Sequence, residues 1–247
     1  MKKIFSLILG ISILASALAS APDSTKLPLS ISCDLVSRYI WRGIDEGNSP
    51  SIQPDIHLTL KNFTIGFWGA YSTSKLSYQE ADLYASYNFL KYFTIGLTDY
   101  FFPPANQPYN YFNYKAKTTG HVIEAQFQVA SIKNIPLSIF LGINIWGADA
   151  PKLDPKTGKQ IGIQHSTYLE LDYSFKNLQF FAGANLTQPN LSAGETGFYA
   201  DKRGLINLGL KATKNLIINK NLSLPLYVSL ITNPVQKHIF LISGITF

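Results

Sequence analysis

The chain has 247 residues, of which 46% are hydrophobic, 13% aromatic and only 15% charged. Soluble globular chains average roughly 25% charged residues, and the abundance of apolar and aromatic side chains excludes intrinsic disorder. The single cysteine, Cys33, excludes a disulfide scaffold. A formal net charge of +6 without clustered basic residues argues against nucleic acid as a partner.

The N-terminus has the pattern of a secretory signal peptide. Lys2 and Lys3 precede an apolar core over residues 4–18, and Ala17 and Ala19 occupy the −3 and −1 positions of a cleavage site before Ser20. A membrane anchor is the alternative, but the apolar run is shorter than the ~20 residues of a spanning helix. We therefore predict a signal peptide at 1–19 and an exported domain at 20–247.

Downstream of this segment, apolar and polar residues alternate with the period of two that is typical of β-strands. In one example, Leu222, Leu224 and Leu226 alternate with Ser223 and Tyr227. Twelve strands are predicted in this way, at 30–40, 51–60, 63–73, 79–89, 92–102, 119–130, 136–147, 164–175, 178–187, 204–213, 222–232 and 237–247.

Two architectures fit such strands, a soluble sandwich and a membrane barrel. In a sandwich the polar faces meet water and should be rich in charge. Here the polar positions are mostly Gly, Ser, Thr, Asn, Gln and Tyr, which suit a confined interior better than bulk water. The pattern therefore favours a barrel whose apolar face contacts lipid.

The connections alternate between short and long. Short ones are predicted at 61–62, 90–91, 131–135, 176–177 and 214–221, and longer ones at 42–50, 74–78, 103–118, 147–163 and 188–203. Short periplasmic turns that alternate with longer external loops are typical of bacterial outer-membrane barrels, which have an even number of strands. We predict an all-β fold, a single up-and-down antiparallel transmembrane β-barrel of about 12 strands with both termini in the periplasm.

The last predicted strand ends in Phe247. A terminal Phe after an alternating strand resembles the signal that the barrel-assembly machinery recognises, so we expect Phe247 to act as an assembly signal. Aromatic residues near other strand ends, such as Tyr39, Trp41 and Phe175, fit the girdles that border the lipid. The expected location is the outer membrane of a Gram-negative bacterium, with outer-membrane lipid as a partner.

The first strand and loop carry a family resemblance. The run Ser37-Arg38-Tyr39-Ile40-Trp41-Arg42-Gly43 resembles the start of the TorF-type porin family, outer-membrane barrels of largely unassigned function. The stretches at 80–87, 98–103 and 224–230 are similar to the same family. The resemblance implies an outer-membrane pore and names no substrate.

Placing the apolar residues outside fixes the set that faces the lumen. Charged side chains at the lipid face cost ~2–4 kcal/mol for Arg or Lys at the bilayer midplane, so charged residues are expected inside. The predicted pore-lining set is Asp34, Arg38, Arg42, Asp55, His57, Glu80, Asp82, Glu124, Glu170, Asp172 and Lys211.

Two interpretations of this set remain open. Seven acids against three bases would favour cations in a pore, so a channel for passive diffusion of small polar solutes or ions is expected, with a weak preference for cations. Alternatively, Arg38 and Arg42 form salt bridges to the acids and fill the interior, as in narrow barrels. The protein would then be a non-conducting barrel with a binding or structural role.

An enzyme is expected less than a channel. His57, His121, His165 and His238 form no compact catalytic constellation in the sequence, and there is no Gly-x-Ser-x-Gly elbow. No pair of histidines has metal-ligand spacing, so neither a metal nor a cofactor is expected. A lipid-modifying outer-membrane enzyme remains an alternative.

A loop between two predicted strands is rich in aromatic residues, namely Tyr109, Tyr111, Phe112 and Tyr114. It can pack in the interfacial girdle, fold inward as a constriction, or bind a partner such as a sugar or a hydrophobic ligand. We expect girdle packing or the inward fold rather than a partner site.

Overall fold

The computed structural model describes residues 28–74, 78–103, 108–130, 135–220 and 222–247. Twelve antiparallel strands close into one barrel in the order β1-β16-β15-β14-β13-β12-β9-β8-β7-β6-β5-β4. Their bounds are β1 Leu29–Val36, β4 Ser51–Leu60, β5 Phe63–Ser72, β6 Gln79–Phe89, β7 Phe93–Phe101, β8 His121–Val129, β9 Leu137–Gly147, β12 Thr167–Phe175, β13 Leu178–Asn185, β14 Gly204–Asn219, β15 Leu222–Asn233 and β16 His238–Thr246. The predicted all-β barrel of twelve strands is confirmed.

Four shorter strands lie in the connections. They form two hairpins, β2 (Ile40–Trp41) with β3 (Ile44–Asp45), and β10 (Pro151–Leu153) with β11 (Gln160–Ile163). A single 3-10 turn, η1 (Leu191–Ala193), lies in the connection between β13 and β14. No helix in the described part of the chain is long and apolar enough to span a membrane.

The outer wall is apolar because alternate residues of each strand point outward. Ile31 and Leu241 are each 73% exposed, and Phe67 and Leu97 are also largely exposed. Cys33 is a free thiol at an outward position between Ile31 and Leu35. A closed barrel with apolar residues on its outer wall is consistent with a protein of the outer membrane.

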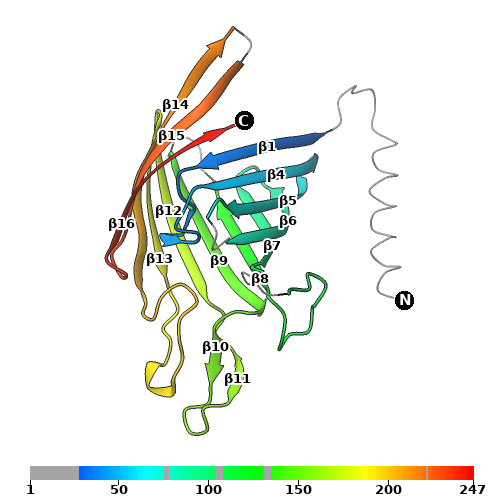
Figure 1. The fold of residues 1–247 in the computed structure, drawn as a ribbon, viewed down its shortest axis with the longest axis vertical. Coiled ribbons are helices and arrows are strands. Elements are labelled where there is room, and N and C mark those ends of the chain that lie inside the picture. The colour runs from blue at the N-terminus through cyan, green and yellow to red at the C-terminus, as the bar shows by residue number, and fades with distance from the viewer. Residues whose placement is uncertain (1–27, 75–77, 104–107, 131–134, 221) are drawn as a thin grey trace, which may run out of the picture.

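The connections segregate by length at the two ends of the barrel (Figure 1). The β10–β11 hairpin lies at one end, and the outer ends of β14 and β15 and the C-terminus lie toward the other. β14 is longer than predicted, since its pairing with β15 continues to Asn219. The run Leu216-Ile217-Ile218 breaks the period of two, which is why alternation alone placed a connection there.

The barrel closes where the first and last strands meet. β1 pairs with β16 through Asp34–Thr246, Leu35–Ile245 and Val36–Gly244. Phe247 extends this seam, because its amide donates to the Cys33 carbonyl at 3.0 Å and its carbonyl accepts from the Cys33 amide at 3.3 Å. The terminal residue therefore belongs to the closing ladder. The predicted signal peptide at 1–19 lies outside the described residues.

Candidate functional site: the lumen and its inward hairpin

The first long connection folds into the barrel instead of extending away from it. Its hairpin, residues 40–45, is called the inward hairpin below. At its tip, Gly43 has a φ of 78° and lies so close to the Ile206 carbonyl of β14 that a Cβ would overlap it. Asn233 Nδ2 of β15 donates to the Gly43 carbonyl at 3.1 Å. The tip is thereby fixed to the wall formed by β14 and β15.

Arg42 extends from the inward hairpin to Glu124 on β8. Its Nη1 and Nη2 donate to Oε2 and Oε1 of Glu124 at 2.5 and 2.8 Å. Only 8% of the Arg42 side chain and none of the Glu124 side chain is exposed. A bidentate guanidinium–carboxylate pair is geometrically specific as well as strong. It therefore ties the hairpin to the β8 wall as well as to β14 and β15.

Aromatic rings surround the Arg42 guanidinium. Its Cζ lies 4.6 Å from the ring centroids of Trp41 and Tyr168, 5.2 Å from that of Phe140 and 5.5 Å from that of Tyr199. Ring faces attract a cation, and the attraction is larger where water is excluded. The buried charge is therefore compensated by these rings in addition to the carboxylate.

Glu124 is held in place as an acceptor. It also accepts hydrogen bonds from Tyr100 Oη at 3.1 Å and from Gln126 Nε2 at 2.9 Å. Its carboxylate lies over Gly142 of β9, where a Cβ would stand 2.5 Å from Oε2. A side chain at position 142 would occupy the place of the Glu124 carboxylate, so Gly142 of the neighbouring strand makes room for it.

On the β1–β6 side of the barrel, Asp34, Asp55, His57, Glu80 and Asp82 occupy inward positions that alternate with the apolar outer wall. His57 Nδ1 lies 2.6 Å from Asp55 Oδ1. Tyr78 Oη donates to Glu80 Oε2 at 2.9 Å, and the Phe101 amide donates to Asp82 Oδ1 at 3.2 Å. Asp55, Glu80 and Asp82 therefore each have a hydrogen-bond partner within the protein, whereas Glu80 Oε1 is buried without one.

Across the lumen, Glu170, Asp172 and Lys211 also occupy inward positions. Glu170 accepts from Tyr168 Oη, and from Asn207 Nδ2 at 2.7 Å. Gln179 Nε2 donates to Asp172 at 2.7 Å, and Lys211 Nζ lies 4.1 Å from the centroid of the Tyr227 ring. Glu170 and Asp172 share one strand face, as their i, i+2 spacing predicts.

Arg38 lies within the strand predicted at 30–40, and the structure corrects that assignment. β1 ends at Val36, so Arg38 and Arg42 both belong to the connection that follows it. Arg38 lies nearer solvent and binds Asp45 Oδ2 at 3.1 Å and Asn48 Oδ1 at 2.6 Å. It braces the connection, whereas Arg42 enters the lumen. The strand ends where the chain must turn inward, which a period of two cannot show.

In the same connection, the pKa of Glu46 is shifted. Burial raises the pKa of Glu46 to about 8, with a further rise from the nearby charge of Glu80. A hydrogen bond with Tyr78 offsets part of this rise. The inward-folded connection therefore favours the neutral form of Glu46 at neutral pH.

The described part of the predicted aromatic loop, residues 108–118, packs against the outer wall near the long-loop end. His121 of β8 is the cross-strand partner of Phe101 of β7, and both occupy outward positions. The Nδ1 atom of His121 lies 2.8 Å from Asp99 Oδ1. Its Nε2 lies 2.6 Å from the Tyr111 carbonyl, and Tyr114 Oη donates to Asp99 Oδ2 at 2.6 Å. Asp99 and His121 thus attach the loop to the wall, and the inward hairpin fills the lumen in its place.

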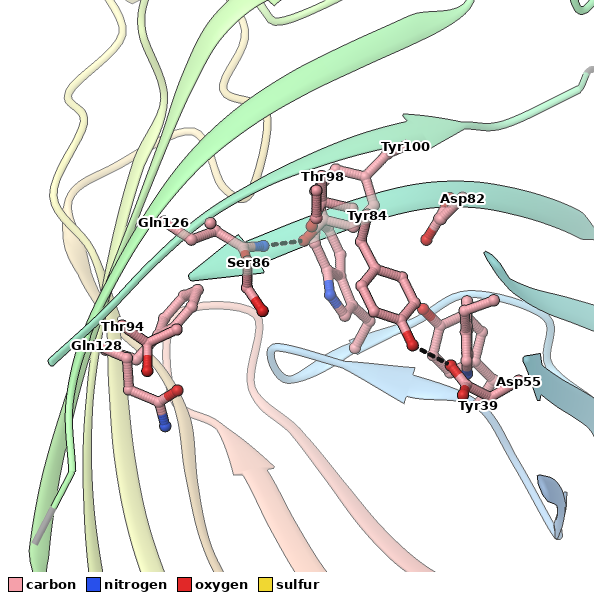
Figure 2. A pocket seen from close by; sticks show the side chains of 15 residues that line it. Tyr39, Asp55, Asp82, Tyr84, Ser86, Thr94, Thr98, Tyr100, Gln126 and Gln128 are labelled. Atoms are coloured by element: carbon pink, nitrogen blue, oxygen red, sulfur yellow. Dashed lines mark hydrogen bonds between the residues drawn. The ribbon is translucent and has the colours of Figure 1, made fainter. Parts of the chain in front are cut away.

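Cavities lie on both sides of the inward hairpin. One of them, the axial cavity, has a volume of about 460 Å³ and reaches from Thr94 and Gln128 to Tyr39 and Trp41. A second interior cavity of about 240 Å³ lies between Ile40 and the β12–β15 wall. Figure 2 shows the axial cavity, with Thr94 and Gln128 at one end and Tyr39, Asp55 and Asp82 at the other.

Sequence reasoning missed the aromatic partners of the hairpin. Trp41 contacts the rings of Tyr100, Phe198 and Tyr199, with centroid distances of 5.3, 6.3 and 5.7 Å. Trp41 was assigned to an interfacial girdle, and Tyr199 was not selected because its loop shows no alternation. No group of three or more metal-ligating side chains is found among the described residues.

A family model and a solved structure show similarity to this chain. A family model described as "Bacterial protein of unknown function (Gcw_chp)" matches residues 19–136. No curated protein matches. Among solved structures, "Salmonella typhi OmpF complex with Daunomycin" aligns with a TM-score of 0.36 and 9% identity over 89% of this chain and 97% of that chain. The TorF-type resemblance stays a prediction.

Proposed function

We propose that this protein is an outer-membrane channel for passive diffusion of small polar solutes or ions. The observation that carries the proposal is the polar interior of the closed barrel, which retains two cavities beside the inward hairpin. Narrow barrels whose interior is only structural are filled by side chains. In this proposal the hairpin forms the constriction, and size and luminal charge select the solute.

We expect a weak preference for cations, because two of the three basic residues of the pore-lining set are paired with carboxylates. The positive charge of Arg42 is neutralised by Glu124, and Arg38 binds Asp45 near solvent. Lys211 is the remaining base of the pore-lining set, against six further carboxylates at inward positions. Excess carboxylate along a narrow passage favours cations.

The proposal includes the partners expected from the sequence. Outer-membrane lipid would contact the apolar wall, and the barrel-assembly machinery would recognise the last strand through Phe247. Membership of the TorF-type porins and a Gram-negative origin belong to the same proposal.

Single-channel recording tests the proposal. Residues 20–247 are refolded in detergent, a shift of gel mobility on boiling verifies the folded barrel, and current is measured across a planar bilayer. We expect stepwise conductance with a reversal potential on the cation-selective side in a salt gradient. A folded barrel without conductance refutes the channel, and an anion-selective potential refutes the charge argument.

A non-conducting binding barrel is the second candidate. The bidentate Arg42–Glu124 pair favours it, because this contact joins the hairpin to the opposite wall across the lumen. We propose no enzymatic activity. The His121–Asp99 pair resembles part of a catalytic constellation, but both ring nitrogens are occupied by oxygen atoms of the protein, Asp99 Oδ1 and the Tyr111 carbonyl, which suits a residue that holds a loop.

A further inference from the structure

We propose that the axial cavity binds the ring of a neutral sugar. The inference deepens the proposed function and rests on it, since it names the class of solute that the interior admits. It stands on three features of the cavity: accessible aromatic rings, neutral polar groups without protein partners, and carboxylates that are already bound by internal donors.

Aromatic rings line the cavity from two elements that are distant in sequence. Tyr39 and Trp41 come from the connection after β1, and Trp68 and Tyr84 come from β5 and β6. All four are half-buried, so part of each ring remains accessible. A sugar ring presents flat faces of C–H groups that pack on aromatic rings, whereas its hydroxyls project from the edge and need polar partners.

Neutral polar side chains supply such partners. Ser86 of β6, Thr98 of β7 and Gln128 of β8 line the cavity, and none has a side-chain hydrogen bond within the described structure. Together they offer hydroxyl and amide groups that can donate and accept.

The carboxylates of the cavity are less available than the neutral groups. Asp55 is bound on both oxygens, by His57 Nδ1 at 2.6 Å and by Tyr84 Oη at 2.8 Å. Asp82 accepts from the Phe101 amide at 3.2 Å. Their negative charge disfavours anionic sugars such as sugar phosphates, and both oxygens of Asp55 already have hydrogen-bond partners within the protein.

The position of Tyr84 shows that the cavity wall is preformed. Its ring crosses over Gly66 of β5, where a Cβ would stand 2.5 Å from both Cζ and Oη. Its hydroxyl is bound to Asp55 (Figure 2). A ring fixed by packing and by a hydrogen bond loses little freedom when a ligand packs on it, which favours binding.

Tryptophan fluorescence offers a direct test. The chain has three tryptophans, of which Trp41 and Trp68 line the cavity, whereas Trp146 lies 6.2 Å from Tyr114 beside the outer-wall loop. In refolded Trp146→Phe protein, titration with glucose should change the emission saturably. Sorbitol has similar hydroxyls without the ring and should bind about tenfold more weakly. Choline tests the competing cation site.

Matched variants locate the binding. In the same background, Gln128→Leu should weaken glucose binding about tenfold, whereas Gln179→Leu, an equal change in the second cavity, should not. Trp68→Leu should weaken it as well, with Trp41 as the reporter. Gel mobility before and after boiling verifies that each variant has folded.

The outcomes separate this inference from the channel proposal. A saturable glucose response without conductance supports the sugar site and refutes the channel. Conductance with no glucose response refutes the sugar site alone. A choline response without a glucose response, or an equal loss in both glutamine variants, also overturns the assignment.

Discussion

The attachment of the inward hairpin can be tested by removing one charge, in Glu124→Gln. The change keeps the shape of the side chain but places an amide N–H₂ group where one carboxylate oxygen accepted from Arg42. Breaking a buried ion pair costs about 3–5 kcal/mol, because the other charge is left without its partner. The surrounding Trp41 and Tyr168 rings still attract the guanidinium, so we take the lower limit.

We expect the hairpin, which belongs to a connection, to leave the lumen more often when its ion pair is lost. A destabilisation of about 3 kcal/mol raises the population of the outward state about 150-fold. Trypsin detects that state, since it cleaves after Arg42 only when this side chain is accessible. Cleavage in the native protein should be slow, because the Arg42 side chain is 8% exposed. When opening is fast, the cleavage rate follows the open population.

The matched control is Asp172→Asn, which removes an inward carboxylate that binds Gln179 and makes no ion pair with Arg42. We expect rapid cleavage between Arg42 and Gly43 in Glu124→Gln and native-like cleavage in the control, measured by mass on folded protein. In a conducting channel, Glu124→Gln should also raise the conductance. Equal cleavage of the two variants at Arg42 would show that the ion pair does not hold the hairpin.

Three further predictions concern the same elements. Gly142→Val should displace the Glu124 carboxylate, on which a Cβ would impinge at 2.5 Å, and should therefore expose Arg42 to trypsin; unchanged protection would contradict the close packing. His121→Phe should release residues 108–118 from the outer wall, because it removes the hydrogen bonds to Asp99 and Tyr111. Trypsin should then cleave at Lys115 about tenfold faster, with no change at Arg42. A loop that stays protected would show that the contacts between the aromatic rings are sufficient to hold it. Burial raises the pKa of Glu46 from its ordinary value to about 8, so folding penalises its ionised form and stability should fall as pH rises from 4.5 to about 8. Urea midpoints at pH 5 and 8.5 should differ less in Glu46→Gln than in the native protein, and an equal difference would exclude Glu46 as the cause.

The strands and their number were predictable because the outer face of a membrane barrel must be apolar at every second residue. Leu178 and Phe180 flank Gln179, and the structure exposes Phe180 on the outer wall and places Gln179 beside Asp172 in the lumen. The inward positions of Glu170 and Asp172 followed from the same rule. The rule failed at Leu216–Ile218, where three consecutive apolar residues belong to β14 although no polar residue alternates with them.

The connections were not predictable in this way, because no period governs them. The aromatic loop at 108–118 and the Arg-Gly run at 42–43 were both visible in the sequence. Which of the two enters the lumen depends on partners that are far away along the chain. Arg42 finds Glu124 and Tyr199, and His121 finds Asp99 and Tyr111.

By itself, the sequence determined the class of the fold, the number of strands and which face of each strand is polar, because these follow from local alternation and the cost of charge in lipid. The tertiary structure alone decided what fills the lumen. Arg42 and Glu124 are 82 residues apart, and the space for their contact depends on Gly142 of a third segment. Closure of the barrel brings these segments together, and a pattern within one strand carries no information about that meeting.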